Sequence, residues 1–145
     1  MRVSIGTDLV HVPGLQQQLE TPGSSFGRVF SDFEWRSARA SAHGKYVHLA
    51  GRWAAKEAFI KAWAQARYGS PPWLREEEIV WSAITVRPDR WGRLALDFSP
   101  QLAAELTASI GEFEHSISIS HDGDYASATC VLYSALSDAD SSDSD

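Results

Sequence analysis

Residues 44–67 form a run of mostly helix-forming residues that contains no proline. Such a run predicts one long helix, because proline is the residue that most strongly breaks helices. The expected buried stripe of this helix, at helical spacing, consists of Tyr46, Ala50, Trp53, Ile60 and Ala64. A helix of this length can span a small domain, so the rest of the chain is expected to pack around it.

Charged residues on this helix follow two patterns. Glu57 falls on the expected stripe, with Lys61 one turn later. A carboxylate there is costly to bury unless a cation or a metal compensates it. A second, cationic row at a spacing of four consists of His48, Arg52 and Lys56. One interpretation is an ordinary ion pair on a solvated helix face, and the other is a binding site for a phosphate-rich ligand.

Before the long helix, residues 2–10 alternate around Val3, Ile5 and Leu9 and predict a strand, with Asp8 near its end. Residues 13–20 predict a short helix with proline in its first turn. Residues 32–40 predict another helix, because Ser31 and Glu34 have the spacing of a capping box.

After the long helix, Ser99 followed by proline predicts the start of a helix that runs to about Ile110. The strands expected in this half cover residues 79–86, 93–98, 114–120 and 125–134, and Cys130 is expected in the core. This order of elements predicts an α+β domain in which a mostly antiparallel sheet packs on the long helix.

A chain of 145 residues fits one domain, which we expect to cover residues 1–136. A single cysteine excludes an intramolecular disulfide, and no stretch resembles a signal peptide or a membrane span, so we expect a cytoplasmic protein. The net charge is −6, and four aspartates in residues 137–145 account for four of those charges. We therefore do not expect the protein to bind nucleic acid. The acidic tail, residues 137–145, is expected to be disordered and dispensable for the chemistry.

Three separated segments resemble one family. Residues 49–62 read LAGRWAAKEAFIKA, residues 5–10 read IGTDLV, and residues 118–122 read SISHD. In this order they are similar to the signature segments of phosphopantetheinyl transferases of the small holo-acyl-carrier-protein synthase type. The resemblance covers residues 3 to about 133.

The resemblance implies transfer of 4′-phosphopantetheine from coenzyme A to a serine of an acyl carrier protein or carrier domain. It implies Asp8 and Glu57 as Mg²⁺ ligands and, with Lys61, as catalytic residues. The residues expected to bind the coenzyme A nucleotide are Arg52, His121, Lys56 and His48. It also implies a homotrimer with active sites at the contacts between subunits.

Two segments depart from the family pattern. Residues 63–69 continue the helix where many relatives have Gly-Thr-Gly, and residues 13–20 lack the basic residues with which many relatives dock the acidic carrier. Arg28, Arg36 and Arg39 are cations of the following region, either for carrier docking or on a solvated face. Two other functions remain open, a Mg²⁺-dependent nucleotide pyrophosphate hydrolase and a non-enzymatic domain that binds nucleotide or carrier protein.

Overall fold

A computed structural model describes residues 1–135, so the predicted tail at 137–145 lies outside the described residues. The helices and strands are, in order, β1 (Arg2–His11), α1 (Val12–Glu20), α2 (Asp32–Arg39), α3 (Lys45–Ala66), β2 (Ile84–Pro88), β3 (Leu94–Phe98), α4 (Pro100–Ile110), β4 (Phe113–Asp122) and β5 (Tyr125–Ser134). Short 3₁₀ helices cover Phe26–Val29, Glu76–Glu78 and Trp81–Ala83. Among the described residues, no helix is both long and apolar enough to cross a membrane.

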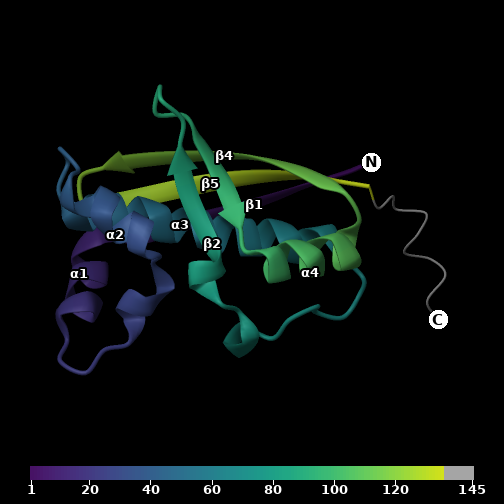
Figure 1. The fold of residues 1–145 in the computed structure, drawn as a ribbon, viewed down its shortest axis with the longest axis horizontal. Helices are drawn as coiled ribbons and strands as arrows, with labels where there is room; N and C mark the ends of the chain where they lie inside the picture. The colour runs from purple at the N-terminus through teal and green to yellow at the C-terminus, as the bar shows by residue number, and fades with distance from the viewer. Residues whose placement is uncertain (136–145) are drawn as a thin grey trace.

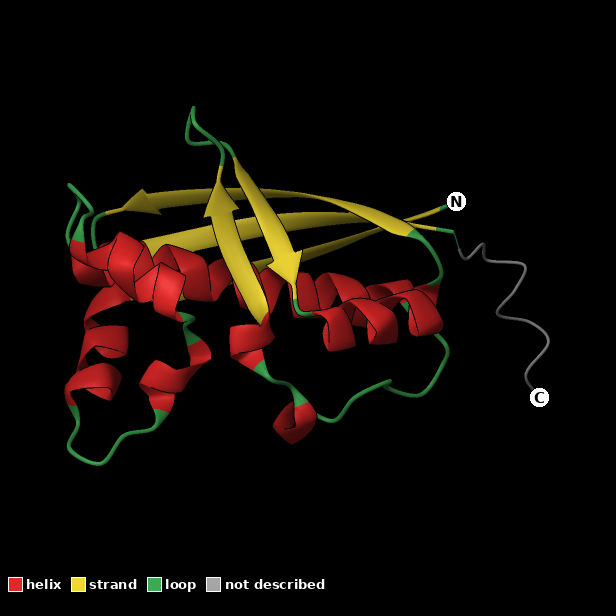
Figure 2. Ribbon diagram, viewed as in Figure 1, coloured by secondary structure: helices red, strands yellow, loops and turns green. Residues whose placement is uncertain are grey.

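The strands form two antiparallel sheets, a three-stranded one in the order β1-β5-β4 and the hairpin β2-β3. The central helix α3 runs along one face of the three-stranded sheet, and the other helices lie on the same side (Figures 1 and 2). The α+β prediction, with antiparallel sheet packed on one long helix, is confirmed. The capping box of Ser31 and Glu34 and the Ser99 cap are also present.

The predicted buried stripe of α3 is largely wrong. Of its members only Ala50 is buried, whereas Ala64 is exposed and the three aromatic and branched residues are only partly buried. The face that meets the sheet is made of small residues, chiefly Ala50, Ala54, Ala58 and Ala62. Small side chains let α3 approach the sheet closely, which a pattern of large apolar residues does not reveal.

Two glycines mark that close approach. A Cβ on Gly6 of β1 would lie 1.9 Å from the Ala58 carbonyl oxygen, and a Cβ on Gly51 would lie 2.9 Å from Ile119 of β4. The strand and helix backbones are therefore in direct contact at Gly6. This contact fixes which residues of β1 face α3.

The strand prediction for residues 2–10 is confirmed, but its apolar residues face outward. Val3, Ile5 and Leu9 are 58%, 57% and 64% exposed, while Ser4, Gly6 and Val10 are buried. Because side chains alternate along a strand, the glycine that contacts α3 turns its apolar neighbours to the opposite face of the sheet.

The strand predicted at 79–86 begins only at Ile84, because residues 81–83 form a 3₁₀ turn. The strands predicted at 93–98, 114–120 and 125–134 are confirmed, with small shifts at their ends. Cys130 is buried, as expected, and burial raises the pKa of its thiol to about 12.

Candidate active site

Asp8 and Lys61 meet at one edge of the three-stranded sheet. The Lys61 ammonium donates hydrogen bonds to Asp8 Oδ1 and to the Thr7 carbonyl oxygen, both at 3.0 Å. The Asp8 side chain is only 10% exposed and its Oδ2 is buried without a hydrogen-bond partner, whereas the Lys61 side chain is 57% exposed. One carboxylate oxygen of Asp8 is therefore left without compensation in a partly desolvated place.

Glu57 lies beside this pair, one helical turn before Lys61. Burial, followed by the hydrogen bond and negative charge of Asp8, raises the pKa of Glu57 to about 8, and Lys61 opposes this shift. The exposed Glu76 adds a smaller repulsion. Nothing in the spacing of the sequence indicates that Glu76 lies near Glu57.

With both carboxyl groups ionised, this acidic cluster, Asp8, Glu57 and Lys61, would carry more negative charge than its lysine neutralises, and burial together with this excess raises the pKa of Glu57. A Mg²⁺ ion fits such a deficit, because it takes one or two carboxylates and completes its coordination with water and phosphate oxygens. In the part of the chain that the structure describes, no group of three or more His, Cys, Asp or Glu residues could hold a metal ion. A phosphate-bearing substrate and water would have to supply the remaining ligands.

Lys56 is adjacent to Glu57 in sequence but points elsewhere. Its ammonium lies 2.7 Å from Glu34, and both side chains are completely buried. It also donates to the carbonyl oxygens of Val29 and Trp81, at 2.6 and 3.1 Å. The expectation that Lys56 binds the nucleotide is therefore revised, because all of its donors are used inside the protein.

The same Glu34 joins several elements. It accepts hydrogen bonds from the backbone nitrogens of Ser31 and Val86, at 2.9 and 3.1 Å. The capping box predicts the first bond, but neither the second bond nor the pairing with Lys56 leaves a signal in the sequence. The Lys56–Glu34 pair thus fastens α2 and β2 to α3.

Arg52 and His48 lie on the side of α3 that faces α2. Burial lowers the pKa of Arg52, and burial together with the charge of Arg52 lowers the pKa of His48 to about 4, while Glu34 opposes both shifts. The His48 Nε2 atom is buried without a partner, and Arg52 makes no hydrogen bond or ion pair with another described residue. The unpaired guanidinium of Arg52 therefore suits an anion, whereas the buried His48 nitrogen is not exposed to a ligand in the single chain.

His121 lies near the end of β4, exposed, with its ring centroid 4.9 Å from that of His43. Strand β4 is at the opposite edge of the sheet from β1, which carries Asp8. The β1 and β4 backbones are separated by β5, or about 10 Å. The structure therefore does not bring His121 to the acidic cluster of its own chain.

Helix α3 also holds the side chains of Arg52 and Glu57 apart. Arg52 and Glu57 are five residues apart, which turns their side chains about 140° from one another around α3. Glu34 influences Arg52 and His48, whereas Asp8 and Glu76 influence Glu57. We call Asp8, Glu57 and Lys61 the acidic half-site, and we call the predicted nucleotide-binding residues that lie away from it, His48, Arg52 and His121, the cationic half-site.

Known proteins resemble this chain throughout the region that carries both half-sites. The profile of the 4′-phosphopantetheinyl transferase superfamily matches residues 4–130. The chain belongs to this superfamily. A holo-[acyl-carrier-protein] synthase of Corynebacterium glutamicum (strain R) is 60% identical over 131 residues, which cover 90% of this chain and 97% of the relative. A second one, from Mycobacterium ulcerans, is 36% identical over 130 residues, 90% of this chain and 95% of the relative.

Solved structures of the superfamily agree with this assignment. A complex of the synthase from Chronobacterium ammoniagenes with CoA superposes with a TM-score of 0.88 at 51% identity and covers 94% of this chain and 100% of its own. The synthase of Mycobacterium tuberculosis superposes with a TM-score of 0.69 at 31% identity, over 90% and 96% of the two chains. The phosphopantetheinyl-transferase fold expected from the sequence is confirmed.

Proposed function

We propose that this protein transfers 4′-phosphopantetheine from coenzyme A to a serine of an apo acyl carrier protein or carrier domain. The observation that carries the proposal is the acidic cluster, in which Asp8 keeps an unpaired buried oxygen and the pKa of Glu57 is raised to about 8, in a chain of this superfamily. Such a cluster suits a substrate that brings a cation and phosphates together.

In this reaction the serine oxygen forms a bond to the β-phosphorus of coenzyme A. The bond from that phosphorus to the bridging oxygen breaks, and adenosine 3′,5′-bisphosphate leaves with the bonding electrons. Asp8 and Glu57 would hold Mg²⁺, which neutralises charge on the pyrophosphate. Lys61, fixed by Asp8 and Thr7, adds a point charge where negative charge develops. The serine proton would pass to a water molecule held by a carboxylate of the acidic cluster.

The cationic half-site recognises the nucleotide. Arg52 and His121 bind the 3′-phosphate of coenzyme A, and His48 supports Arg52 from the preceding helical turn. The uncompensated guanidinium of Arg52 and the exposed ring of His121 support this assignment.

The two half-sites are completed between chains, in a homotrimer that places the acidic half of one subunit against the cationic half of the next. Their separation on opposite sides of α3 supports this arrangement. So does the outer face of β1, where Val3, Ile5 and Leu9 form an exposed apolar stripe next to Tyr133 and Val131 of β5. We expect the enzyme to act in the cytoplasm.

Mass spectrometry tests the activity directly. Purified protein is incubated with Mg²⁺, coenzyme A and an apo carrier protein, and the carrier should gain one phosphopantetheine. Coenzyme A incubated without the carrier should stay intact, which separates transfer from pyrophosphate hydrolysis. Cleavage without an acceptor, or an unchanged carrier, would contradict the proposal.

A further inference from the structure

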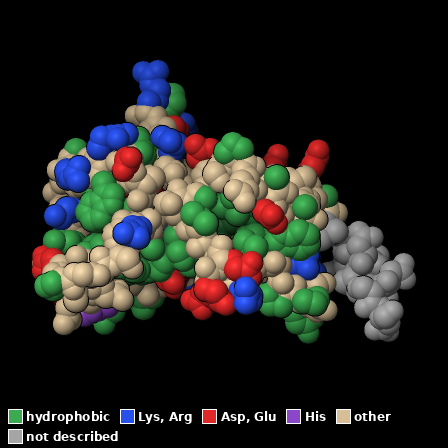
Figure 3. All heavy atoms as spheres, turned by 60° about the horizontal axis from the view of Figure 1, so that its bottom comes forward, with side chains coloured by type: hydrophobic (Ala, Val, Ile, Leu, Met, Phe, Trp, Pro, Cys, Tyr) green, Lys and Arg blue, Asp and Glu red, His purple; other side chains and the backbone are tan. Residues whose placement is uncertain are grey.

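The β2-β3 hairpin carries none of the residues of the two half-sites. Its turn, residues 89–93, projects beyond the body of the molecule, and Figure 3 shows Lys and Arg side chains on this projection (Figures 1 and 3). Within the turn, the Asp89 side chain accepts hydrogen bonds from the backbone nitrogens of Trp91 and Arg93, at 2.8 and 2.9 Å. Two strands alone are not stable in water, so contacts with the rest of the chain must hold the hairpin in place.

One rung of the hairpin is held from both sides. Val86 of β2 and Leu96 of β3 are buried and lie opposite each other in the ladder. In every second pair of an antiparallel ladder, the backbone N–H groups point outward. The Val86 nitrogen donates to Glu34 Oε2 of α2, at 3.1 Å. The Leu96 nitrogen donates to His115 Nε2 of β4, at 2.8 Å. Two ionisable side chains from different elements therefore hold the same rung.

His115 connects the two sheets. Strand β3 packs beside β4, and the His115 ring meets the Phe98 ring of β3 edge-on, with 5.8 Å between the ring centroids. An imidazole nitrogen accepts a hydrogen bond only when it carries no proton, so His115 is neutral, with its proton on Nδ1. Burial disfavours the charged form and lowers the pKa of His115.

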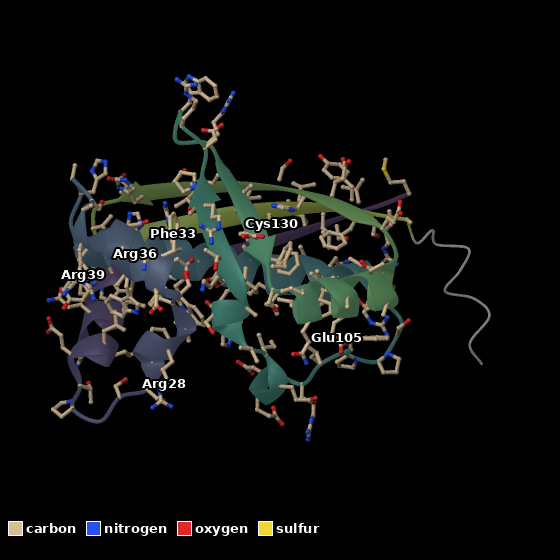
Figure 4. The ribbon with its side chains drawn as sticks, viewed as in Figure 1. Arg28, Phe33, Arg36, Arg39, Glu105 and Cys130 are labelled. Carbon is tan, nitrogen blue, oxygen red and sulfur yellow. The ribbon has the colours of Figure 1, made fainter. Side chains whose placement is uncertain are left out.

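The ionisable groups of the neighbouring strands do not stabilise a charged His115. Glu114 of β4 and Asp97 of β3 are exposed, each adjacent in sequence to an inward-facing residue and so on the opposite face of its strand. On β5, Leu132 is the cross-strand partner of His115. Cys130, two positions earlier on the same face (Figure 4), stays a neutral thiol because burial raises its pKa to about 12.

The helices around the two sheets have their inner charges occupied. On α3, the buried Lys56 is bound by Glu34, 2.7 Å away. On α4, Glu105 accepts a hydrogen bond from the Trp73 indole nitrogen (Figure 4). Neither carboxylate is bonded to His115, so a proton gained there would leave a positive charge without a bonded partner in a half-buried place.

We propose that His115 is a pH-sensitive latch, which holds the β2-β3 hairpin to β4 when neutral and releases it when protonated. Protonation makes Nε2 a donor, which then faces the N–H of Leu96, also a donor, and their hydrogen bond is lost. Glu34 still holds Val86 on the other side of the rung. Release therefore frees β3 from β4 without detaching β2 from α2. The latch acts on the fold and does not depend on the proposed activity.

Hydrogen exchange of the hairpin amides tests the latch. In the released state the pKa of His115 returns toward its ordinary value of 6.5, so release takes up a proton. The equilibrium constant for opening the hairpin should therefore rise about tenfold for each pH unit below 6.5, until the lowered pKa is reached. Exchange rates corrected for their intrinsic pH dependence measure this constant. Amides of α3 are the reference for opening of the whole domain, because the raised pKa of Glu57 shifts global stability in the opposite direction.

Three variants separate the latch from general effects of histidine. His115→Gln retains an acceptor that does not titrate, so the hairpin should stay protected at low pH. His115→Phe keeps a ring without an acceptor, so hairpin exchange should be fast at every pH. His11→Gln is the matched control, because the exposed His11 also accepts a backbone hydrogen bond through a ring nitrogen, from Gly14 at 3.2 Å. This control should keep the pH dependence of the wild type.

NMR of the wild-type protein tests the hydrogen bond itself. A scalar coupling between the Leu96 nitrogen and His115 Nε2 should be present at neutral pH and disappear on acidification. This measurement needs no variant, so it decides the question even if His115→Phe does not fold. Absence of the coupling at neutral pH would overturn the proposal. So would hairpin exchange with the same pH dependence in His115→Gln as in the wild type, or equal acceleration of hairpin and α3 amides at low pH.

Discussion

Two lysine–carboxylate pairs on adjacent turns of α3 differ in almost every physical respect. Lys56 and Glu34 are completely buried, 2.7 Å apart, and their remaining polar atoms are hydrogen-bonded to backbone groups. Lys61 and Asp8 are 3.0 Å apart, but one Asp8 oxygen is unpaired and the neighbouring Glu57 has its pKa raised to about 8. The first pair is satisfied within the protein, whereas the second leaves one carboxylate oxygen of Asp8 without a partner.

The charged residues in one row along a helix can have different roles. His48, Arg52 and Lys56 follow one another at a spacing of four, yet only the last is enclosed by a carboxylate and two carbonyl oxygens. Buried charges that are fully paired hold elements together, whereas incompletely paired charges mark a place for a ligand.

We expect the greatest loss of turnover from a substitution of Glu57, beside the Asp8–Lys61 pair. Glu57→Gln removes the charge and keeps the size, so turnover should fall by about two to three orders of magnitude. The melting temperature should stay the same or rise, because a repulsion with Asp8 disappears. Turnover and thermal unfolding of the purified variant check both expectations. Wild-type turnover at ordinary Mg²⁺ concentrations would remove Glu57 from the catalytic residues.

At the buried Lys56–Glu34 pair, we expect a substitution to reduce stability. Lys56→Met leaves Glu34 buried without its cation and should cost about 3–5 kcal/mol of unfolding free energy in urea titrations. Adding Glu34→Gln should recover part of that loss. The matched change Lys61→Met should cost under about 1 kcal/mol, because this side chain is 57% exposed. Equal losses from Lys56→Met and Lys61→Met would remove the distinction between the pairs.

A smaller effect is expected in the cationic half-site. Arg52→Ala and His121→Ala should raise KM for coenzyme A about tenfold to a hundredfold and change KM for dephospho-coenzyme A much less. The reason is that only coenzyme A presents the 3′-phosphate. If both donors weaken equally, these residues contact the pyrophosphate or support the fold.

The smallest effect is a pH dependence of stability. The folded pKa of Glu57, about 8, lies above its ordinary value of 4.5, so the folded state holds an extra proton between these values. Stability should therefore fall as pH rises from about 5 to 8, and less so in Glu57→Gln. Mg²⁺ should reduce the fall by compensating the ionised carboxylates. Melting temperatures across this range test it, and identical profiles for wild type and variant would contradict the raised pKa.

Local signals in the sequence were sufficient for much of the fold. The capping box at Ser31 and the Ser99 cap depend on neighbouring residues, and both helices begin where these signals indicate. Which face of an element is buried depends on partners distant in sequence. Gly6 must contact α3, so Val3 and Ile5 face outward, although their alternation alone fits either face.

In the candidate site, too, spacing in the sequence relates some residues, whereas only the fold brings the others together. Helical spacing relates Glu57 to Lys61, and the family resemblance adds Asp8, which the fold brings to Lys61. No spacing rule connects Lys56 to Glu34, which is 22 positions away and on another helix. The separation of the two half-sites likewise follows from strand order, which the sequence does not contain.

We expect each active site to combine the acidic half-site of one subunit with the cationic half-site of another, and mixing impaired subunits tests this expectation directly. Glu57→Gln and Arg52→Ala proteins are unfolded together in equal amounts, refolded, and assayed for transfer to an apo carrier at a coenzyme A concentration well below the wild-type KM, where both variants are impaired. Random assembly should restore about a quarter of wild-type activity, since a site is intact only when one subunit supplies Glu57 and its neighbour supplies Arg52. Activity no higher than the average of the two variants refolded separately would show that each chain builds its site alone.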